Sequence, residues 1–100
     1  MQALLNETEL HAAMAERPHW ETRHSALSRA VQAPSFMTGI RLVEAVAEEA
    51  EGIDHHPDID IRWTTVTFRL STHSAGGITA KDVDLAGRID ALVDKLVPPG

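Results

Sequence analysis

Two hydrophobic periods alternate along the 100-residue chain, and they restrict the folds that it can adopt. Over residues 36–53 and 83–96, apolar residues recur every three or four positions, which is the period of an amphipathic helix. Over residues 58–70 they alternate with polar residues, which is the period of a half-buried strand. A chain that carries both periods is expected to pack helices on a sheet.

Capping signals indicate where the first and last helices begin. Asn6, followed three residues later by a glutamate, has the form of a capping box and predicts a helix over about residues 7–16. Thr79 and Asp82 have the same spacing and open the last helix. The second helix is expected to begin at Pro34. The predicted buried stripes are Phe36, Ile40, Val43, Ala47, Ala50 and Ile53 in the second helix, and Val83, Ala86, Ile89, Val93 and Leu96 in the last.

The strands are predicted from short runs without a helical period. Residues 20–33 are expected to form two short, partly exposed strands. Residues 58–63 and 65–72 are expected to form two half-buried strands. The order helix, strands, helix, strands, helix indicates an α+β fold with helices on an antiparallel sheet. The alternating apolar residues are Ile59, Ile61 and Trp63 in the first run, and Val66, Phe68 and Leu70 in the second.

Composition limits the class of protein. With 43% hydrophobic and 24% charged residues, residues 1–100 are expected to fold as a single domain. The formal net charge is -6 and the nine basic residues are scattered, so direct binding of nucleic acid is not expected. The absence of cysteine excludes a disulfide scaffold and a thiolate metal site. No apolar run is long enough to span a membrane and the N-terminus does not resemble a signal peptide, so we expect a cytoplasmic protein.

Three of the six histidines lie at predicted element boundaries, where functional residues collect. His55 and His56 separate the second helix from a strand, and His73 ends the last strand. Each one alone is more readily explained as a boundary residue without a role, and it is their grouping that indicates function. A metal site that includes Asp54 and Asp58 is an alternative, but adjacent histidines fit it poorly because strand neighbours point to opposite faces. We expect no metal.

Two acidic residues near these histidines also have ordinary explanations. Asp82 is the expected capping-box partner of Thr79, and the sequence leaves this role and a functional role equally open. Glu51 is by default a solvated helix residue.

A pattern of several parts links these residues. The run Glu51-Gly-Ile-Asp-His55-His56-Pro57 is followed by Trp63, by Ser71-Thr72-His73 and by Gly76-Gly-Ile-Thr79-Ala-Lys-Asp82. In order and spacing, the pattern resembles the signature of the pterin-4a-carbinolamine dehydratases. The likeness extends upstream through Trp20 and covers nearly the whole chain. A pattern with this many parts is far more specific than His-His-Pro alone.

The resemblance implies a fold, an activity and an assembly. The fold would be a four-stranded antiparallel sheet with three α-helices packed on one face. The activity would be the dehydration of 4a-hydroxytetrahydropterin to quinonoid dihydropterin, without a metal or organic cofactor, in the recycling of the tetrahydropterin used by aromatic amino acid hydroxylases. The assembly would be a homodimer or homotetramer. In the last helix, Leu85 and Leu92 lie off the predicted stripe and are expected to face the partner.

The resemblance also implies roles for individual residues. His55 and His73 would form the acid–base pair, and His56 would mainly hold the pterin. Imidazole suits both proton transfers because its unperturbed pKa of about 6.5 allows one ring to be charged and another to be neutral near pH 7. The alternative is a non-catalytic protein of the same fold that acts by binding or assembly. The residues implied to bind substrate or to support the site are Glu51, Trp63 and Asp82.

Overall fold

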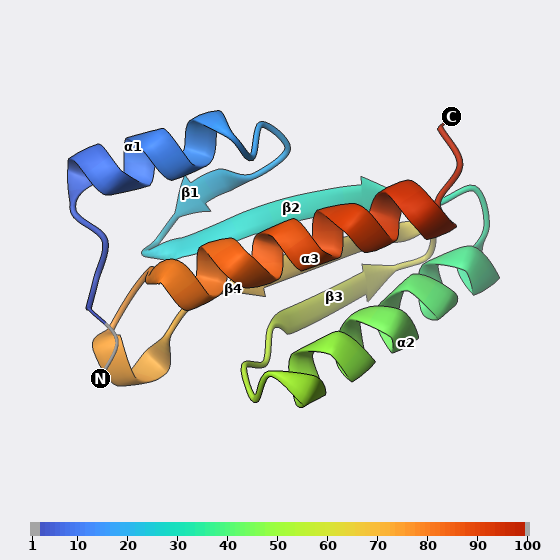
Figure 1. Cartoon of the computed structure of the whole chain (residues 1–100). Coiled ribbons are helices and arrows are strands. Elements are labelled where there is room, and N and C mark those ends of the chain that lie inside the picture. Colours follow the sequence, from blue (N-terminus) through green and yellow to red (C-terminus); the bar gives the residue numbers. More distant parts are fainter. Residues whose placement is uncertain (1–2, 100) are drawn as a thin grey trace.

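Within residues 3–99, which the computed structural model describes, the chain forms three α-helices and a four-stranded antiparallel sheet of order β1-β2-β4-β3 (Figure 1). This arrangement confirms the predicted α+β fold. No helix among these residues is long and apolar enough to cross a membrane. The elements are α1 (Glu7–Ala15), β1 (Glu21–Arg23), β2 (Ala26–Gln32), α2 (Phe36–Gly52), β3 (Asp58–Arg62), β4 (Thr65–Leu70), the 3₁₀ turn η1 (His73–Ala75) and α3 (Ala80–Leu96).

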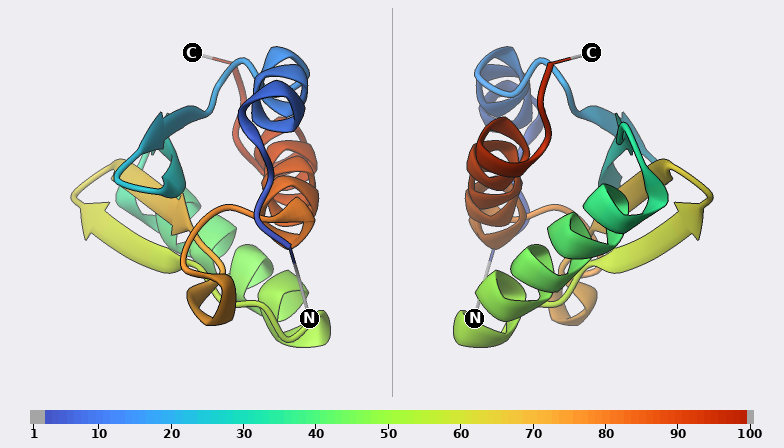
Figure 2. Two further views of the ribbon diagram at one scale, coloured as in Figure 1. Left: turned by 90° about the vertical axis from the view of Figure 1, so that its left-hand side faces the viewer. Right: turned by 90° about the vertical axis from the view of Figure 1, so that its right-hand side faces the viewer.

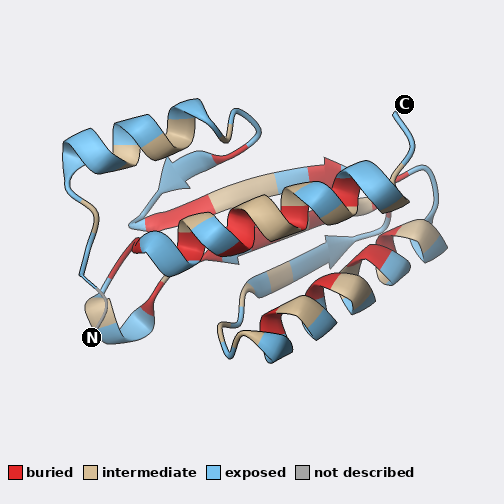
Figure 3. Ribbon diagram, in the orientation of Figure 1, coloured by how far each residue is buried: buried red, intermediate tan, exposed pale blue. Residues whose placement is uncertain are grey.

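The helices lie on one face of the sheet and leave its other face open (Figure 2). Burial is concentrated on β2, on β4 and on the sides of α2 and α3 that face them (Figure 3). Burial of these apolar side chains is the main favourable contribution to folding. The core consists of Trp20, Leu27, Val31, Leu42, Val46, Val66, Phe68, Leu70, Ile78, Leu85, Ala86, Ile89 and Val93.

The capping box predicted for the first helix is present. The Asn6 side chain accepts a hydrogen bond from the Glu9 backbone N–H at 2.8 Å, and the Glu9 carboxylate accepts one from the Asn6 backbone N–H at 2.9 Å. The helix ends at Ala15, close to the predicted position.

The buried stripe predicted for the second helix is only partly correct, because Val43 and Ile53 pack against the core but are not fully buried. The buried residues of α2 are Gly39, Leu42, Val46 and Ala50. Only Ala50 belongs to the predicted set, whereas Phe36 is 46% exposed. The actual stripe also has steps of three and four residues, so periodicity alone could not choose between them. Gly39 decides the rotation, because a Cβ at this position would lie 3.3 Å from the Val66 side chain of β4.

Two other burial predictions need correction. β4 is buried on its apolar face as expected, but β3 is an edge strand that the helices do not cover, and Ile61 is 38% exposed. Leu85 does not face outward from α3, because its side chain is fully buried in the core. Leu85, one of the two residues predicted to face a partner, is therefore not on the surface of α3.

One buried polar cluster fastens α3 to the sheet. The Trp20 indole N–H donates to Asp90 Oδ1 at 2.8 Å, and the Arg29 guanidinium on β2 forms an ion pair with the same oxygen. The side chains of Arg29 and Asp90 are only 10% and 19% exposed. Removal of one partner from such a pair leaves a charge in the interior without compensation.

We therefore expect Asp90→Ala to lower the free energy of unfolding by about 3 kcal/mol, measured by chemical denaturation. Asp94→Ala is the matched control, because Asp94 is an exposed aspartate on the same helix. Its effect should stay within about 0.5 kcal/mol. Equal effects of the two substitutions would contradict the role given to Asp90.

Candidate active site

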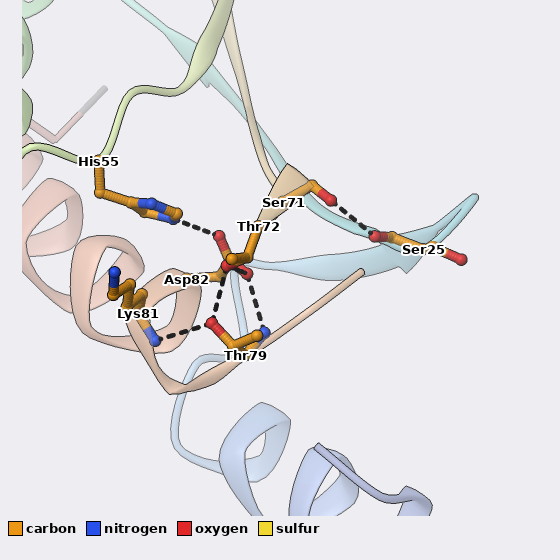
Figure 4. Close-up of polar contacts among 7 residues, drawn as sticks. All are labelled: Ser25, His55, Ser71, Thr72, Thr79, Lys81 and Asp82. Carbon is orange, nitrogen blue, oxygen red and sulfur yellow. Dashed lines mark hydrogen bonds and ion pairs between the residues drawn. The ribbon is translucent and has the colours of Figure 1, made fainter. Parts of the chain in front are cut away.

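Segments that are far apart in the sequence meet at one end of the sheet (Figure 1). His55 and His56 lie in the connection between α2 and β3, and His73 begins η1 directly after β4. The start of α3 and the turn between β1 and β2 lie at the same end. The Ser71 hydroxyl donates to the backbone carbonyl of Ser25 at 3.3 Å, which holds this turn against the end of β4 (Figure 4).

The three predicted histidines line one hollow of about 270 Å³ at this end of the molecule. His55 comes from the buried side of the hollow, with a side chain 11% exposed, whereas His73 is exposed. The structure therefore brings together the three residues that the sequence grouped. The other lining residues are Asp54, Ser71, Thr72, Ser74 and Lys81.

A fully buried carboxylate holds His55 (Figure 4). Asp82 Oδ1 lies 2.6 Å from His55 Nε2. The other oxygen, Oδ2, accepts from the Thr79 backbone N–H at 2.9 Å and from the Thr72 hydroxyl at 2.8 Å. Capping of α3 and contact with a histidine are thus combined in one side chain. The capping role predicted for Asp82 is confirmed, and its functional role stays a prediction.

The hydroxyl protons around Asp82 have one consistent arrangement. Thr72 donates its proton to the carboxylate, so it can only accept in its 2.7 Å contact with the Thr79 hydroxyl. Thr79 therefore donates to Thr72, while its oxygen accepts from the Lys81 backbone N–H. This chain of donors satisfies the hydrogen-bonding capacity of Asp82 Oδ2 in the interior.

Glu51 meets a different histidine. Its carboxylate lies 2.7 Å from His56 Nε2 near the end of α2. The side chains of His56 and Glu51 are 57% and 79% exposed, so the pair is screened by solvent and contributes little to stability. Its effect is to orient the His56 ring at the rim of the hollow.

The structure does not bring Trp63 to the histidines. Trp63 lies in the turn between β3 and β4, at the opposite end of the sheet, and is 80% exposed (Figure 1). Its position gives no support to a role in this site.

Thr72, Lys81 and Ser71 line the hollow but carried no predicted role. The inward position of Thr72 could have been predicted from the sequence. Neighbouring residues at a strand end point in opposite directions, so an outward His73 predicts an inward Thr72 next to α3. Within residues 3–99, no group of three or more His, Cys, Asp or Glu side chains is arranged to hold a metal ion.

Comparison with known proteins agrees with this geometry. The family model described as "Pterin 4 alpha carbinolamine dehydratase" matches residues 3–92. A protein of Mycobacterium sp. (strain KMS), named "Putative pterin-4-alpha-carbinolamine dehydratase", is 53% identical over 93% of this chain and 99% of its own length. A protein of the same name from Nocardia farcinica is 55% identical over 89% of this chain and 94% of its own length.

Two solved structures resemble the fold. A crystal structure from Brucella melitensis, described as a transcriptional coactivator/pterin dehydratase, has a TM-score of 0.86 and 28% identity over 89% of this chain and 97% of that one. A pterin dehydratase-like protein described as a RuBisCO assembly factor has a TM-score of 0.62 and 22% identity over 75% of this chain and 87% of that one, which is evidence for the fold alone. From the family model and the two relatives, the chain belongs to the pterin-4-alpha-carbinolamine dehydratase family.

Proposed function

We propose that the protein dehydrates 4a-hydroxytetrahydropterin to quinonoid dihydropterin and water, with histidines as acid and base. The observation that carries the proposal is that His55, His56 and His73 line one hollow, with His55 held by the buried Asp82. Membership of the family supports the reaction type. The physiological role that follows is recycling of a tetrahydropterin after aromatic hydroxylation, in a cytoplasmic enzyme that uses no cofactor.

The reaction needs one proton to be delivered and one to be removed. The acid protonates the hydroxyl at C4a, and the C–O bond breaks as an adjacent ring nitrogen supplies its electron pair. Water leaves, and the ring becomes a cation. The base then takes a proton from a ring nitrogen and gives the neutral quinonoid product. The reaction is balanced in protons, because the protein donates one and accepts one. A positioned side chain accelerates each proton transfer by about 10²–10⁴-fold.

The contact between His55 and Asp82 favours His55 as the base. A carboxylate can only accept, so Nε2 carries the proton in this contact and Nδ1 is left with a lone pair when the ring is neutral. Asp82 then stabilises the imidazolium that forms after proton transfer. His73 is an exposed lining residue of the same hollow and acts as the acid that protonates the leaving hydroxyl. His56 mainly holds the pterin.

Replacement of the proposed acid or base should reduce turnover. We expect His55→Ala and His73→Ala each to lower kcat by about 10²–10⁴-fold, measured by the appearance of quinonoid product. His56→Ala should chiefly raise KM, because a residue that only binds contributes equally to the ground state and the transition state.

His11→Ala is the control for these variants, because His11 is an exposed histidine of α1 outside the histidine-lined hollow. It should keep the kinetics of the unsubstituted protein. If His55→Ala and His73→Ala both retained normal dehydration, acid–base catalysis by these residues would be disproved. The non-catalytic alternative, a binding or assembly protein, would then replace it.

The double role of Asp82 predicts a combined defect. Asp82→Asn should lower the free energy of unfolding by about 1 kcal/mol through the weakened cap. It should also lower kcat, because a neutral amide does not stabilise an imidazolium at His55. Glu9→Gln makes the matching change at the N3 position of the α1 capping box, outside the histidine-lined hollow, and should affect stability alone. An Asp82→Asn protein with undiminished kcat would reduce Asp82 to a capping residue.

We also propose a homodimer or homotetramer. Leu85 no longer supports it. Exposed apolar side chains remain on α2, on β3 and in the turn after β3, namely Phe36, Met37, Ile61 and Trp63. Light scattering at micromolar concentration should give a multiple of the chain mass of 10.9 kDa. A mass equal to that of one chain would refute the assembly.

A further inference from the structure

A second hollow adjoins the first on the open face of the sheet. Its volume is about 210 Å³, and it shares three lining residues with the first hollow: His56, Ser71 and His73. The shared residues show that the two hollows are adjacent. Each is small for a whole ligand, since pockets for drug-sized molecules measure about 300–1,000 Å³. The remaining lining residues are His24, Ala26, Asp58 and Arg69.

The polar side chains of this second hollow offer hydrogen-bond donors to a ligand. With histidines counted as neutral, as in the formal charge of -6 for the chain, Arg69 offsets the single carboxylate, Asp58, and three histidines add ring nitrogens to the lining. Arg69 lies in register with Asp58 on the neighbouring strand. No ion pair of Arg69 is formed within residues 3–99, and its side chain is exposed. Its guanidinium is therefore available to a ligand.

The turn between β1 and β2 supplies the third histidine of this hollow, His24. His24 and Ser25 both have positive φ, at 48° and 61°, and form a two-residue hairpin turn between paired Arg23 and Ala26. Such turns favour Asn-Gly or other residues that tolerate the left-handed region. Histidine is among the residues that tolerate this region, and the turn places His24 in the lining of the second hollow.

We propose that the second hollow binds an anionic substituent, a carboxylate or a phosphate, of the pterin whose ring lies among the three catalytic histidines. The inference rests on the proposed function and adds a substrate class to it. Arg69 is the main ligand, because its planar guanidinium presents paired donors that match a carboxylate or a phosphate. His24 adds a further donor from the opposite rim. Asp58 opposes the anion and limits the affinity.

Binding of stable aromatic pterins tests the subsite separately from catalysis. The probes are 6-hydroxymethylpterin, its monophosphate and pterin-6-carboxylate, titrated calorimetrically into the full chain at low salt. We expect at least one anionic probe to bind about tenfold more tightly than the neutral one, as one additional charge-assisted hydrogen bond would give. The preference should shrink at high salt, because the hollow is open to solvent.

Substitutions assign the preference to named residues. Arg69→Gln should bring the ratio of anionic to neutral affinity close to one, and His24→Asn, which suits positive φ, should lower it. Asp58→Asn should raise it. Arg41→Gln is the control for net charge, because Arg41 is exposed on α2 and does not line either hollow. It should leave the ratio unchanged.

The outcomes separate the two hypotheses. Equal binding of neutral and anionic probes, or a preference that survives Arg69→Gln, would overturn the anionic subsite and leave the pterin site intact. If none of the pterins bound, the proposed function would fail and the subsite would fail with it.

Discussion

The arrangement of the site depends on the hydrogen bonds of the buried Asp82 carboxylate. A charge without solvent is unfavourable unless hydrogen bonds compensate for it, and Asp82 finds its donors on three separate segments. The Thr79 backbone fixes the start of α3, the Thr72 hydroxyl fixes the end of β4, and His55 fixes the connection that follows α2. The helix layer, the sheet and the site are therefore joined at one side chain.

The three histidines differ in their exposure to solvent. His55 is packed against a buried partner, so its ring is oriented before any ligand binds. His56 and His73 stand at the rim in contact with solvent. In the proposed reaction, the base is therefore the histidine whose ring is already held in place. The three helices all lie on the other face of the sheet (Figure 2).

Predictions from the sequence succeeded where local chemistry decides the structure. The capping boxes, the buried alternation of β4 and the order of elements were all predictable, because each depends on residues close together in the chain. The rotation of α2 about its own axis was not predictable from the sequence. Apolar residues surround much of that helix, and the choice of buried side was made by the close approach of Gly39 to Val66, which is 27 positions distant in the sequence.

The candidate site shows the same division. The sequence by itself determined that His55, His56 and His73 stand at the ends of elements and that Asp82 can cap the last helix. Only the tertiary structure decided that Asp82 also meets His55, that Trp63 lies at the far end of the sheet, and that His24 and Arg69 join the histidines. Spacing along a chain fixes the face of an element, but contacts between elements depend on strand pairing and on helix packing, which are set by the whole core.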